Sequence, residues 1–271
     1  MIPRAHITAW RARAPWPQDE QVEQDLVLCR ALSEMYARPV LGDGLAFRGG
    51  TALHKLFFDP PGRYSEDLDL VQVTAGPIKP ILLEVQLALD HWLDAPRLQQ
   101  TKNGVKLFYG YESTAQPVRP MRVKIEINTR EHFAHEGFHR VPFVVDSRWY
   151  TANVALTTYS LEELLATKLR ALYQRKKGRD LYDLWLALDT MAPDAERVAV
   201  CFRAYLAHGG LSVSRAEYEA NMAQKLDSSE FRIDVEPLLR DASAYDIDSA
   251  YALVHAHLIA RLPGQPWKGS P

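Results

Sequence analysis

Two aspartates one residue apart, Asp67 and Asp69, constrain this chain of 271 residues more than any other feature. They lie in a run of β-compatible apolar residues, so we predict a strand over residues 67–73. Because side chains alternate between the two faces of a strand, both carboxylates project from the same side. Two ionised carboxylates about 4 Å apart repel each other by roughly 4 kcal/mol at an effective dielectric constant of about 20. A divalent cation would turn that repulsion into a binding site, and Mg²⁺ is usually held by one or two carboxylates together with substrate phosphates.

A glycine pair followed by a hydroxyl residue, Gly49-Gly50-Thr51, precedes the acidic strand. We predict a short strand over 45–47 before this turn and a helix over 52–58 after it. Glycine lets the backbone approach a phosphate closely, the threonine hydroxyl can donate a hydrogen bond, and the positive end of a helix favours an anion. Taken singly, Asp-Leu-Asp is often a plain strand edge and Gly-Gly-Thr is often a plain turn. Their combination in one short unit indicates a site for a metal ion and a phosphate.

A further carboxylate, Glu126, lies in a second predicted strand over 122–128. The odd-numbered residues of this strand are apolar and form one face, while Lys124, Glu126 and Asn128 form the other. Two interpretations stay open. The strand is half solvated and carries a Lys–Glu pair on its polar face, or Glu126 supplies a third acidic group beside the aspartate pair.

Composition places the chain among ordinary globular proteins, since 47% of its residues are hydrophobic, 24% are charged and the net charge is −2. No overall basicity points to nucleic acid, so any such contact must come from a local patch. Six of the twelve residues from 168 to 179 are basic. That run is either a solvated helix end that complements the helix dipole or a footprint for an RNA backbone.

Cysteine and histidine spacing gives no clear metal site. Cys29 and Cys201 lie in apolar helical segments, and we expect two buried thiols. The spacing of His132, His135 and His139 is compatible with zinc, but the segment lacks helical periodicity, so we expect surface loop residues. The chain begins without an apolar signal core and has no apolar run of 18 residues, so we expect a cytoplasmic protein with no membrane contact.

A Ser-x-x-Glu capping box from Ser160 to Glu163 predicts a helix that begins there and ends near Gly178. Lys168 falls within the apolar stripe of this helix. Its side chain either snorkels along a surface face or reaches into a polar cleft, where it would contact a triphosphate as a point charge. Asp180 is placed to cap the next helix.

Hydrophobic periodicity predicts the remaining elements. Residues 1–16 are expected to be irregular because prolines flank the tryptophans, and a break is expected over 39–44. Another strand is predicted over 105–112, and the sheet region is expected to end at 157–159. Further helices are predicted over 18–38, 78–93, 180–191, 198–207, 214–222, 234–239 and 246–262.

The segment FRGGTAL…RYSEDLDL resembles the signature of nucleotidyltransferases with the DNA polymerase β-like fold, in which a glycine–hydroxyl pair precedes Asp-x-Asp. Fifteen residues separate Thr51 from Asp67. This longer spacing is similar to that of the AbiEii/AbiGii toxin family of abortive-infection toxin–antitoxin systems. The helix that carries Lys168 and the RDLYDL run after it also resemble motifs of that family. The likeness covers residues 21–188 and continues more loosely to residue 260.

The resemblance implies an α/β (α+β) fold in two lobes. A polymerase β-like nucleotidyltransferase lobe, with an N-terminal helix and a mixed sheet, would cover residues 1–156. A mainly helical C-terminal lobe would cover residues 157–271. The active cleft would lie between the two lobes.

The resemblance also implies a role for each matching residue. Mg²⁺, or Mn²⁺ as an alternative, would be held by Asp67, Asp69 and Glu126, and Glu126 would be either a metal ligand or a base. Lys168 would stabilise the leaving pyrophosphate, and Asp180 would orient Lys168. The catalytic residues would thus be Asp67, Asp69, Glu126, Lys168 and Asp180. The nucleotide-binding residues would be Gly49, Gly50, Thr51, Ser65 and Lys168.

The implied function is that of a toxin that transfers a nucleoside monophosphate from an NTP to an acceptor hydroxyl, with pyrophosphate as the leaving group. The family implies the tRNA 3′ end as acceptor and an antitoxin partner, often a winged-helix DNA-binding protein. Two other functions stay open on the sequence: a nucleotidyltransferase that modifies a protein or a small molecule, and a non-catalytic regulator that binds NTP.

Overall fold

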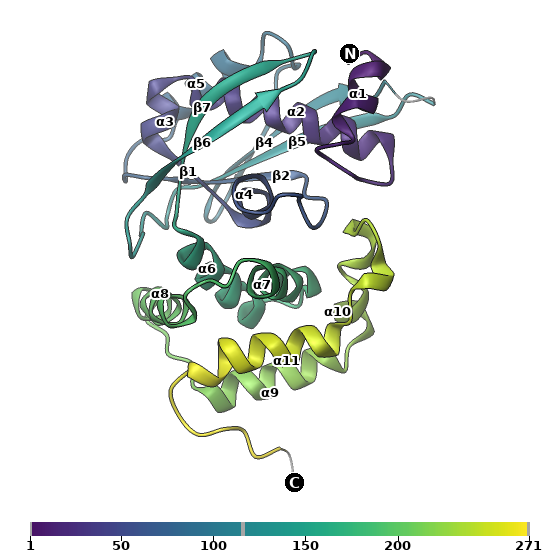
Figure 1. The fold of residues 1–271 in the computed structure, drawn as a ribbon. Helices are drawn as coiled ribbons and strands as arrows, with labels where there is room; N and C mark the ends of the chain where they lie inside the picture. Colours follow the sequence, from purple (N-terminus) through teal and green to yellow (C-terminus); the bar gives the residue numbers. More distant parts are fainter. Residues whose placement is uncertain (1, 115–116, 270–271) are drawn as a thin grey trace. The chain divides into compact units, whose positions relative to one another are not determined.

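The computed structural model describes residues 2–114 and 117–269. The chain divides into two compact units, Met1–Tyr159 and Ser160–Pro271. Figure 1 shows that the first unit contains the sheet and that the second is made of helices.

Within its described residues, the first unit contains a seven-stranded sheet with the order β3-β4-β5-β2-β1-β7-β6. Strand β2 pairs in parallel with β5 and β1 pairs in parallel with β7, whereas the other pairs are antiparallel. This arrangement confirms the α/β class with a mixed sheet. The strands are β1 (Leu45–Arg48), β2 (Asp67–Gln72), β3 (Arg97–Thr101), β4 (Gly104–Glu112), β5 (Pro120–Asn128), β6 (His139–Asp146) and β7 (Thr151–Thr158).

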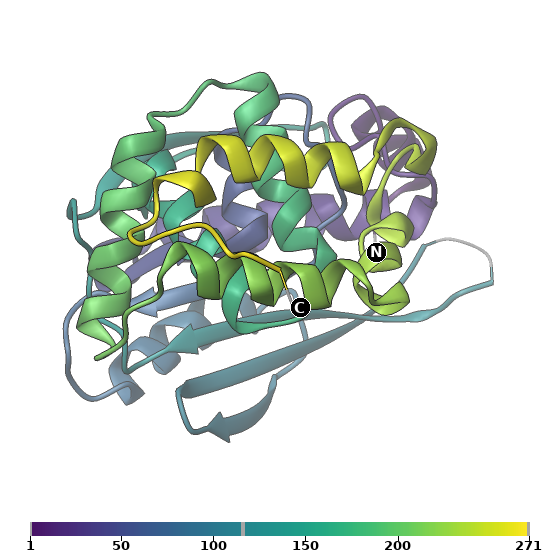
Figure 2. The same cartoon turned by 90° about the horizontal axis from the view of Figure 1, so that it is seen from below.

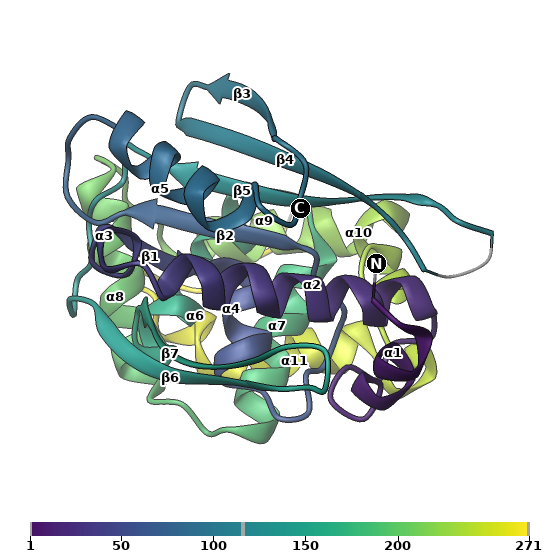
Figure 3. The same cartoon turned by 90° about the horizontal axis from the view of Figure 1, so that it is seen from above.

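Helices cover both faces of this sheet. Figures 1 and 3 show α2, α3 and α5 on one face and α4 on the opposite face, where α4 contacts β1 and β2. The helices of this unit are α1 (Arg4–Trp10), α2 (Asp19–Tyr36), α3 (Pro39–Gly44), α4 (Gly49–Leu56) and α5 (Lys79–Leu89).

Alternation along β2 and β5 decides which side chains each face of the sheet carries. Leu68 and Leu70 of β2 are buried and pair with the buried Ile125 and Ile127 of β5. These four side chains form part of the apolar face that α2 covers. The residues between them, including Asp67 and Asp69, therefore point to the opposite face, on which α4 lies.

Several predictions for the first unit are wrong. Residues 4–10 form α1 rather than irregular chain, because Pro3 precedes the helix at a place where its missing N–H costs nothing. Pro39 likewise begins a short helix, α3, where a break is expected. The sequence pattern does not reveal the edge strands β3 and β6, since β3 is almost entirely exposed and β6 contains Pro142.

The second unit is helical, as Figure 2 shows from below, and α6 contacts both α7 and α8 while α7 contacts α11. The predicted cap at Ser160 is confirmed, because its hydroxyl accepts a hydrogen bond from the Glu163 N–H at 3.1 Å. The helices are α6 (Leu161–Gln174), α7 (Gly178–Thr190), α8 (Ala195–His208), α9 (Arg215–Leu226), α10 (Ser229–Ile233) and α11 (Ile247–His257).

The junction between α6 and α7 differs from the prediction. Helix α6 ends at Gln174, and Gly178 begins α7 instead of ending α6. A Cβ atom at Gly178 would lie 2.2 Å from the Phe231 carbonyl oxygen, so glycine is required there for close backbone packing. Asp180 is consequently not a cap but a buried residue in the first turn of α7.

The predicted helix over 234–239 is also wrong, because α10 ends at Ile233 and only a single 3₁₀ turn, Glu236–Leu238, follows it. Cys29 and Cys201 are both buried and lie outside any disulfide, as expected. Across the residues that the structure describes, no helix combines the length and apolar character needed to cross a bilayer.

Candidate active site

The three carboxylates expected to share a site lie on one face of the sheet. In the parallel pairing of β2 with β5, Asp69 is the register partner of Glu126, and Asp67 is the partner of Lys124. Register partners project from the same side of a sheet. All four side chains are half-buried, so they form one charged patch on the α4 face. The structure thus brings together the acidic residues that the sequence singles out.

Two lysines balance part of this negative charge. The Lys124 Nζ lies 2.6 Å from the Asp67 Oδ2 and 3.7 Å from the Glu126 Oε2. The Lys106 Nζ, from β4, lies 3.0 Å from the same Glu126 oxygen. The Lys–Glu pair predicted for the polar face of β5 is therefore present, and it is present beside the aspartates. Sequence reasoning missed Lys106, whose only signal is its even position in the alternating strand β4.

The fold raises the pKa of Asp69. Its burial raises its pKa, and the negative charges of Asp67 and Glu126 raise the pKa further, whereas the Arg48 guanidinium and Lys124 lower it. The net direction is upward. The positive charge of Arg48 is shared between Asp69 and Glu131, because the Arg48 Nη1 donates to the Glu131 carboxylate at 2.7 Å. Asp69 is thus held in a position where its charge is incompletely compensated, and a bound cation would relieve that cost.

The glycine turn contacts the acidic pair directly. Gly49 has a φ of +80°, a left-handed conformation that favours glycine. A Cβ atom at this position would lie 2.6 Å from the Asp69 Oδ2. Helix α4 therefore begins with bare backbone against the carboxylate. Gly50, the next residue, is buried in the first turn of α4.

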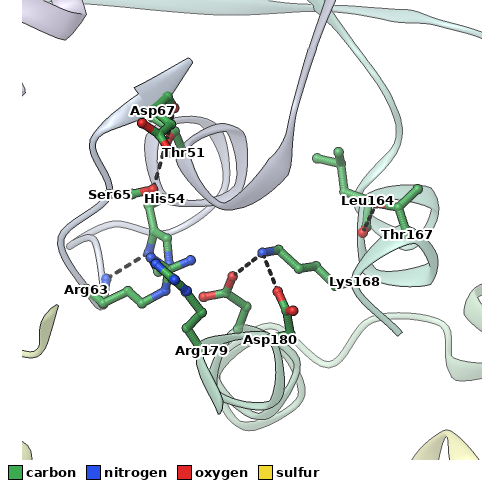
Figure 4. A network of polar contacts seen from close by, with 12 residues as sticks. Thr51, His54, Arg63, Ser65, Asp67, Leu164, Thr167, Lys168, Arg179 and Asp180 are labelled. Atoms are coloured by element: carbon green, nitrogen blue, oxygen red, sulfur yellow. Dashed lines mark hydrogen bonds and ion pairs between the residues drawn. The ribbon is translucent and has the colours of Figure 1, made fainter. Parts of the chain in front are cut away.

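The hydroxyl of Thr51 ties the start of α4 to the start of β2. Thr51 is buried, its Oγ1 donates to the main-chain oxygen of Asp67, and it lies 2.7 Å from the Ser65 Oγ, as Figure 4 shows. This link fixes the turn relative to the acidic strand. Ser65 is half-buried and closer to solvent. Contact of either hydroxyl with a nucleotide stays a prediction.

A small hollow of about 120 Å³ opens beside Asp69 and Glu126. The hollow is of interest as a ligand site because of its position and not its size, since larger cavities in this unit lie away from these carboxylates. The other polar or glycine residues of its lining are Arg48, Asn103, Gly104 and Asn128.

The acidic pair fits a hard divalent cation that takes its remaining ligands from a substrate. Asp67 and Asp69 offer carboxylate oxygens on one face, which suits Mg²⁺ or Mn²⁺ bound by one or two carboxylates plus phosphate oxygens. No group of three or more His, Cys, Asp or Glu side chains in the described ranges is arranged to hold a metal ion by itself. Glu126, which contacts Lys106, stays a predicted third ligand or base.

Among the described residues, the histidine run is likewise not part of a group of three or more side chains placed to hold a metal ion. The Nδ1 of His132 lies 2.7 Å from the main-chain oxygen of Gln72. His139 is an exposed residue at the start of the edge strand β6.

In the second unit, Lys168 is buried rather than spread along a surface. Its Nζ lies 3.0 Å from the Asp180 Oδ1 and 2.8 Å from the Asp183 Oδ2, and Figure 4 shows its contact with Asp180. The interpretation of Lys168 as a surface stem is therefore wrong. Asp183 is the partner that sequence reasoning left out of the site, although its i, i+3 spacing from Asp180 places both on one face of α7.

Arg175 completes this network. It forms two hydrogen bonds with Asp180, from Nε at 2.7 Å and from Nη2 at 2.8 Å. Burial raises the pKa of Asp180, but the charges of Lys168 and Arg175 and the Arg175 hydrogen bond outweigh that effect and lower it overall. Two basic and two acidic side chains thus compensate one another, and the network holds α7 against the end of α6.

The basic run over 168–179 is largely occupied by partners inside the second unit. Besides Lys168 and Arg175, Lys177 and Arg179 both contact Asp234, at 3.2 Å and 3.3 Å. Arg170 lies over the ring of Tyr205, and Lys176 lies 4.0 Å from Glu230. These pairings favour the interpretation of a structural helix end over that of an RNA footprint.

Comparison with known proteins agrees with this geometry. The sequence model of the family described as nucleotidyl transferase AbiEii toxin, type IV TA system, matches residues 30–253, which is well over half of the chain. No curated protein matches the chain at a significant level.

Solved structures share the fold at low sequence identity. MenT4, a nucleotidyltransferase toxin from Mycobacterium tuberculosis H37Rv, is 17% identical, with a TM-score of 0.65 over 97% of this chain and 91% of that chain. JHP933 from Helicobacter pylori is 15% identical, with a TM-score of 0.57 over 89% of this chain and 90% of that chain. A nucleotidyltransferase-like structure, also from H. pylori, is 14% identical, with a TM-score of 0.55 over 89% and 93% of the two chains.

Replacing Gly49 should disable the acidic pair. We expect Gly49→Ala to weaken Mg²⁺-dependent NTP binding by about tenfold or more, because the added Cβ would displace the Asp69 carboxylate. Gly137→Ala is the matched control, since Gly137 has nearly the same φ, +79°, and nothing within 4 Å of its Cβ position. Equal binding losses in the two variants would show that backbone strain alone is responsible.

Removing the charge of Asp69 should stabilise the metal-free protein. The raised pKa means that the ionised carboxylate costs folding free energy above its unfolded pKa, and that this cost vanishes as the pH falls below that value. At pH 7 in EDTA, Asp69→Asn should raise the melting temperature by about 2–4 °C, which corresponds to roughly 1 kcal/mol.

Asp67→Asn is the control for that measurement. It removes the ion pair with Lys124 and should leave the melting temperature unchanged or lower. A lower melting temperature in Asp69→Asn would contradict the assignment of Asp69 as the strained carboxylate.

Lys168 and Asp183 should be energetically coupled. Lys168→Met removes the cation that contacts both buried carboxylates, so the free energy of unfolding should fall by about 3 kcal/mol or more. The double variant Lys168→Met/Asp183→Asn should recover at least a third of that loss in urea titrations. A double variant that is no more stable than the single one would show that the pair is not coupled.

Proposed function

Because the chain belongs to the nucleotidyl transferase AbiEii toxin family of type IV toxin–antitoxin systems, we propose that its reaction takes place at Asp67 and Asp69. The reaction is the transfer of a nucleoside monophosphate from an NTP to an acceptor hydroxyl, with pyrophosphate as the leaving group. The proposed acceptor is the 3′ end of tRNA.

A single observation carries this proposal. The backbone of Gly49 lies directly against Asp69, on the same face as Asp67 and opposite Glu126. One strand thus presents two carboxylates for a cation, and the adjoining turn presents unsubstituted backbone for a phosphate. The upward shift of the Asp69 pKa supports the same assignment, because burial and, after it, the charges of Asp67 and Glu126 disfavour the ionised carboxylate, which a bound cation would stabilise.

Each residue of the site has a proposed task. Asp67 and Asp69 would hold a divalent cation, Mg²⁺ or Mn²⁺, which would supply charge neutralisation for the triphosphate. Lys124 contacts the Asp67 carboxylate at 2.6 Å and would have to release it to such a cation. Glu126 accepts the proton of the attacking hydroxyl, and Lys106 keeps that carboxylate oriented.

The network of the second unit has a proposed task as well. Lys168 stabilises the negative charge of the leaving pyrophosphate, and Asp180 orients its ammonium group. The Lys168 Nζ has three N–H donors, of which the contacts with Asp180 and Asp183 engage two.

The proposed partners follow from the family. A type IV toxin implies an antitoxin, and a nucleotidyltransferase implies an NTP substrate. Modification of a protein or of a small molecule is the competing proposal, since the same acidic pair would serve any acceptor hydroxyl.

Transfer should be tested with each α-³²P-labelled NTP, Mg²⁺, total tRNA and a cell extract. We expect label in tRNA, and we expect Asp69→Asn to lower the rate by on the order of 10²-fold or more, because the cation loses a ligand. Asp146→Asn is the control, since Asp146 is an exposed residue at the end of β6.

The site of the label discriminates between the proposals. Label confined to protein or to small products would replace tRNA as the acceptor. Full transfer activity in Asp69→Asn would remove the acidic pair from the mechanism.

A further inference from the structure

The acidic pair of β2 lies on a polar face of the sheet that continues across β5 and β4 to the edge strand β3. One register line across β2, β5, β4 and β3 consists of Asp67, Lys124, Phe108 and Arg97. Since register partners point to the same side, all four side chains share the face of Asp67. The line spans three strand spacings, or about 14 Å. The neighbouring line consists of Asp69, Glu126, Lys106 and Gln99.

This face carries an aromatic ring, Phe108, with two guanidinium groups close to it. The Arg97 Cζ lies 4.5 Å from the Phe108 ring centroid, and the Arg122 Cζ lies 5.4 Å from it. Both arginines are exposed, whereas Phe108 is half-buried. The group therefore presents planar, stacked surfaces with positive charge at their edges.

The part of this face formed by β3, β4 and β5 carries more cations than carboxylates, in a chain whose net charge is −2. On the polar side of β3, β4 and β5, the described residues include four cations, namely Arg97, Lys106, Arg122 and Lys124, and two carboxylates, namely Glu112 and Glu126. Glu112 lies at the far end of β4, and Glu126 is paired with Lys106. The Phe108 ring itself lies against the cationic groups of Arg97 and Arg122.

We propose that this face, the β3–β5 platform, binds the single-stranded end of an RNA acceptor and leads its terminal hydroxyl to the acidic pair. Phosphates would contact Arg97, Arg122 and Lys106, and a base would stack on Phe108 and its flanking guanidinium groups. The inference rests on the proposed function for the identity of the acceptor, and it goes beyond it by naming the surface that selects RNA.

A single strand is favoured over a duplex by the chemistry of the platform. An aromatic side chain on a sheet surface reaches a base only where that base is unpaired and exposed. A duplex would offer phosphates to the arginines but no base to Phe108. An acidic protein segment would likewise use the arginines and leave Phe108 without a specific role. Sensitivity to Phe108 therefore discriminates between these occupants.

The test is RNA binding by the full chain in EDTA without NTP, so that it does not depend on catalysis. The probe is a fluorescein-labelled single-stranded RNA of eight nucleotides, measured by anisotropy at several salt concentrations. We expect Arg97→Gln/Arg122→Gln to weaken binding by tenfold or more and to reduce the slope of log K against log salt by about 1.4, as expected for two lost phosphate contacts.

Phe108→Leu should weaken binding by about tenfold without changing the salt slope, because it removes a stacking surface but no charge. The matched control is Arg13→Gln/Arg148→Gln, which removes two exposed arginines outside the platform and should bind RNA as the unaltered chain does. Melting temperature and Mg²⁺-dependent NTP binding should be unchanged in all three variants.

Three outcomes would overturn the platform: unchanged RNA affinity in Phe108→Leu and in Arg97→Gln/Arg122→Gln, equal affinity for the same RNA in a duplex, or tighter binding of poly-glutamate than of RNA. Failure of the proposed function looks different, because RNA binding would then respond to the platform variants while no label is transferred. If label is transferred to RNA while the platform variants bind RNA as the unaltered chain does, the platform proposal fails and the proposed function stands.

Discussion

The parallel pairing of β2 with β5 is the constraint on which the first unit depends. It sets Asp69 opposite Glu126 and Asp67 opposite Lys124, while the apolar residues between them form the buried face of the same strands. A shift of one residue would bury the acids and expose the leucines, so core packing fixes the charged patch as firmly as it fixes the strands. The fold thereby holds the carboxylates close enough to repel each other, and a bound cation would relieve that repulsion.

The two units differ in how far the negative charge of their clustered carboxylates is compensated. In the second unit, Lys168 and Arg175 compensate Asp180 and Asp183 internally, and the pKa of Asp180 is lowered overall. In the first unit, the compensation of Asp69 is incomplete, and its pKa is raised. The compensated network of the second unit holds its helices together. The incompletely compensated Asp69 of the first unit costs stability, which is the usual sign of a group kept for binding or chemistry.

Local patterns predicted the elements around the site well and the outer elements poorly. Alternation in DLDL and RVKIEIN indicated both central strands and the faces of their acids, and the Ser160 cap indicated the start of α6. The edge strand β3 was missed because exposed strands carry no apolar pattern. Gly178 misled because a glycine required for contact with the Phe231 carbonyl has the same local signature as a helix end.

The sequence by itself determined that Asp67 and Asp69 share a face, because strand alternation is a local property of the chain. Only the tertiary structure decided which cations stand beside those acids, that Gly49 lies against Asp69, and that Lys168 is buried between two aspartates. These contacts join residues far apart in the chain, so strand register and helix packing, rather than any local spacing, bring them together.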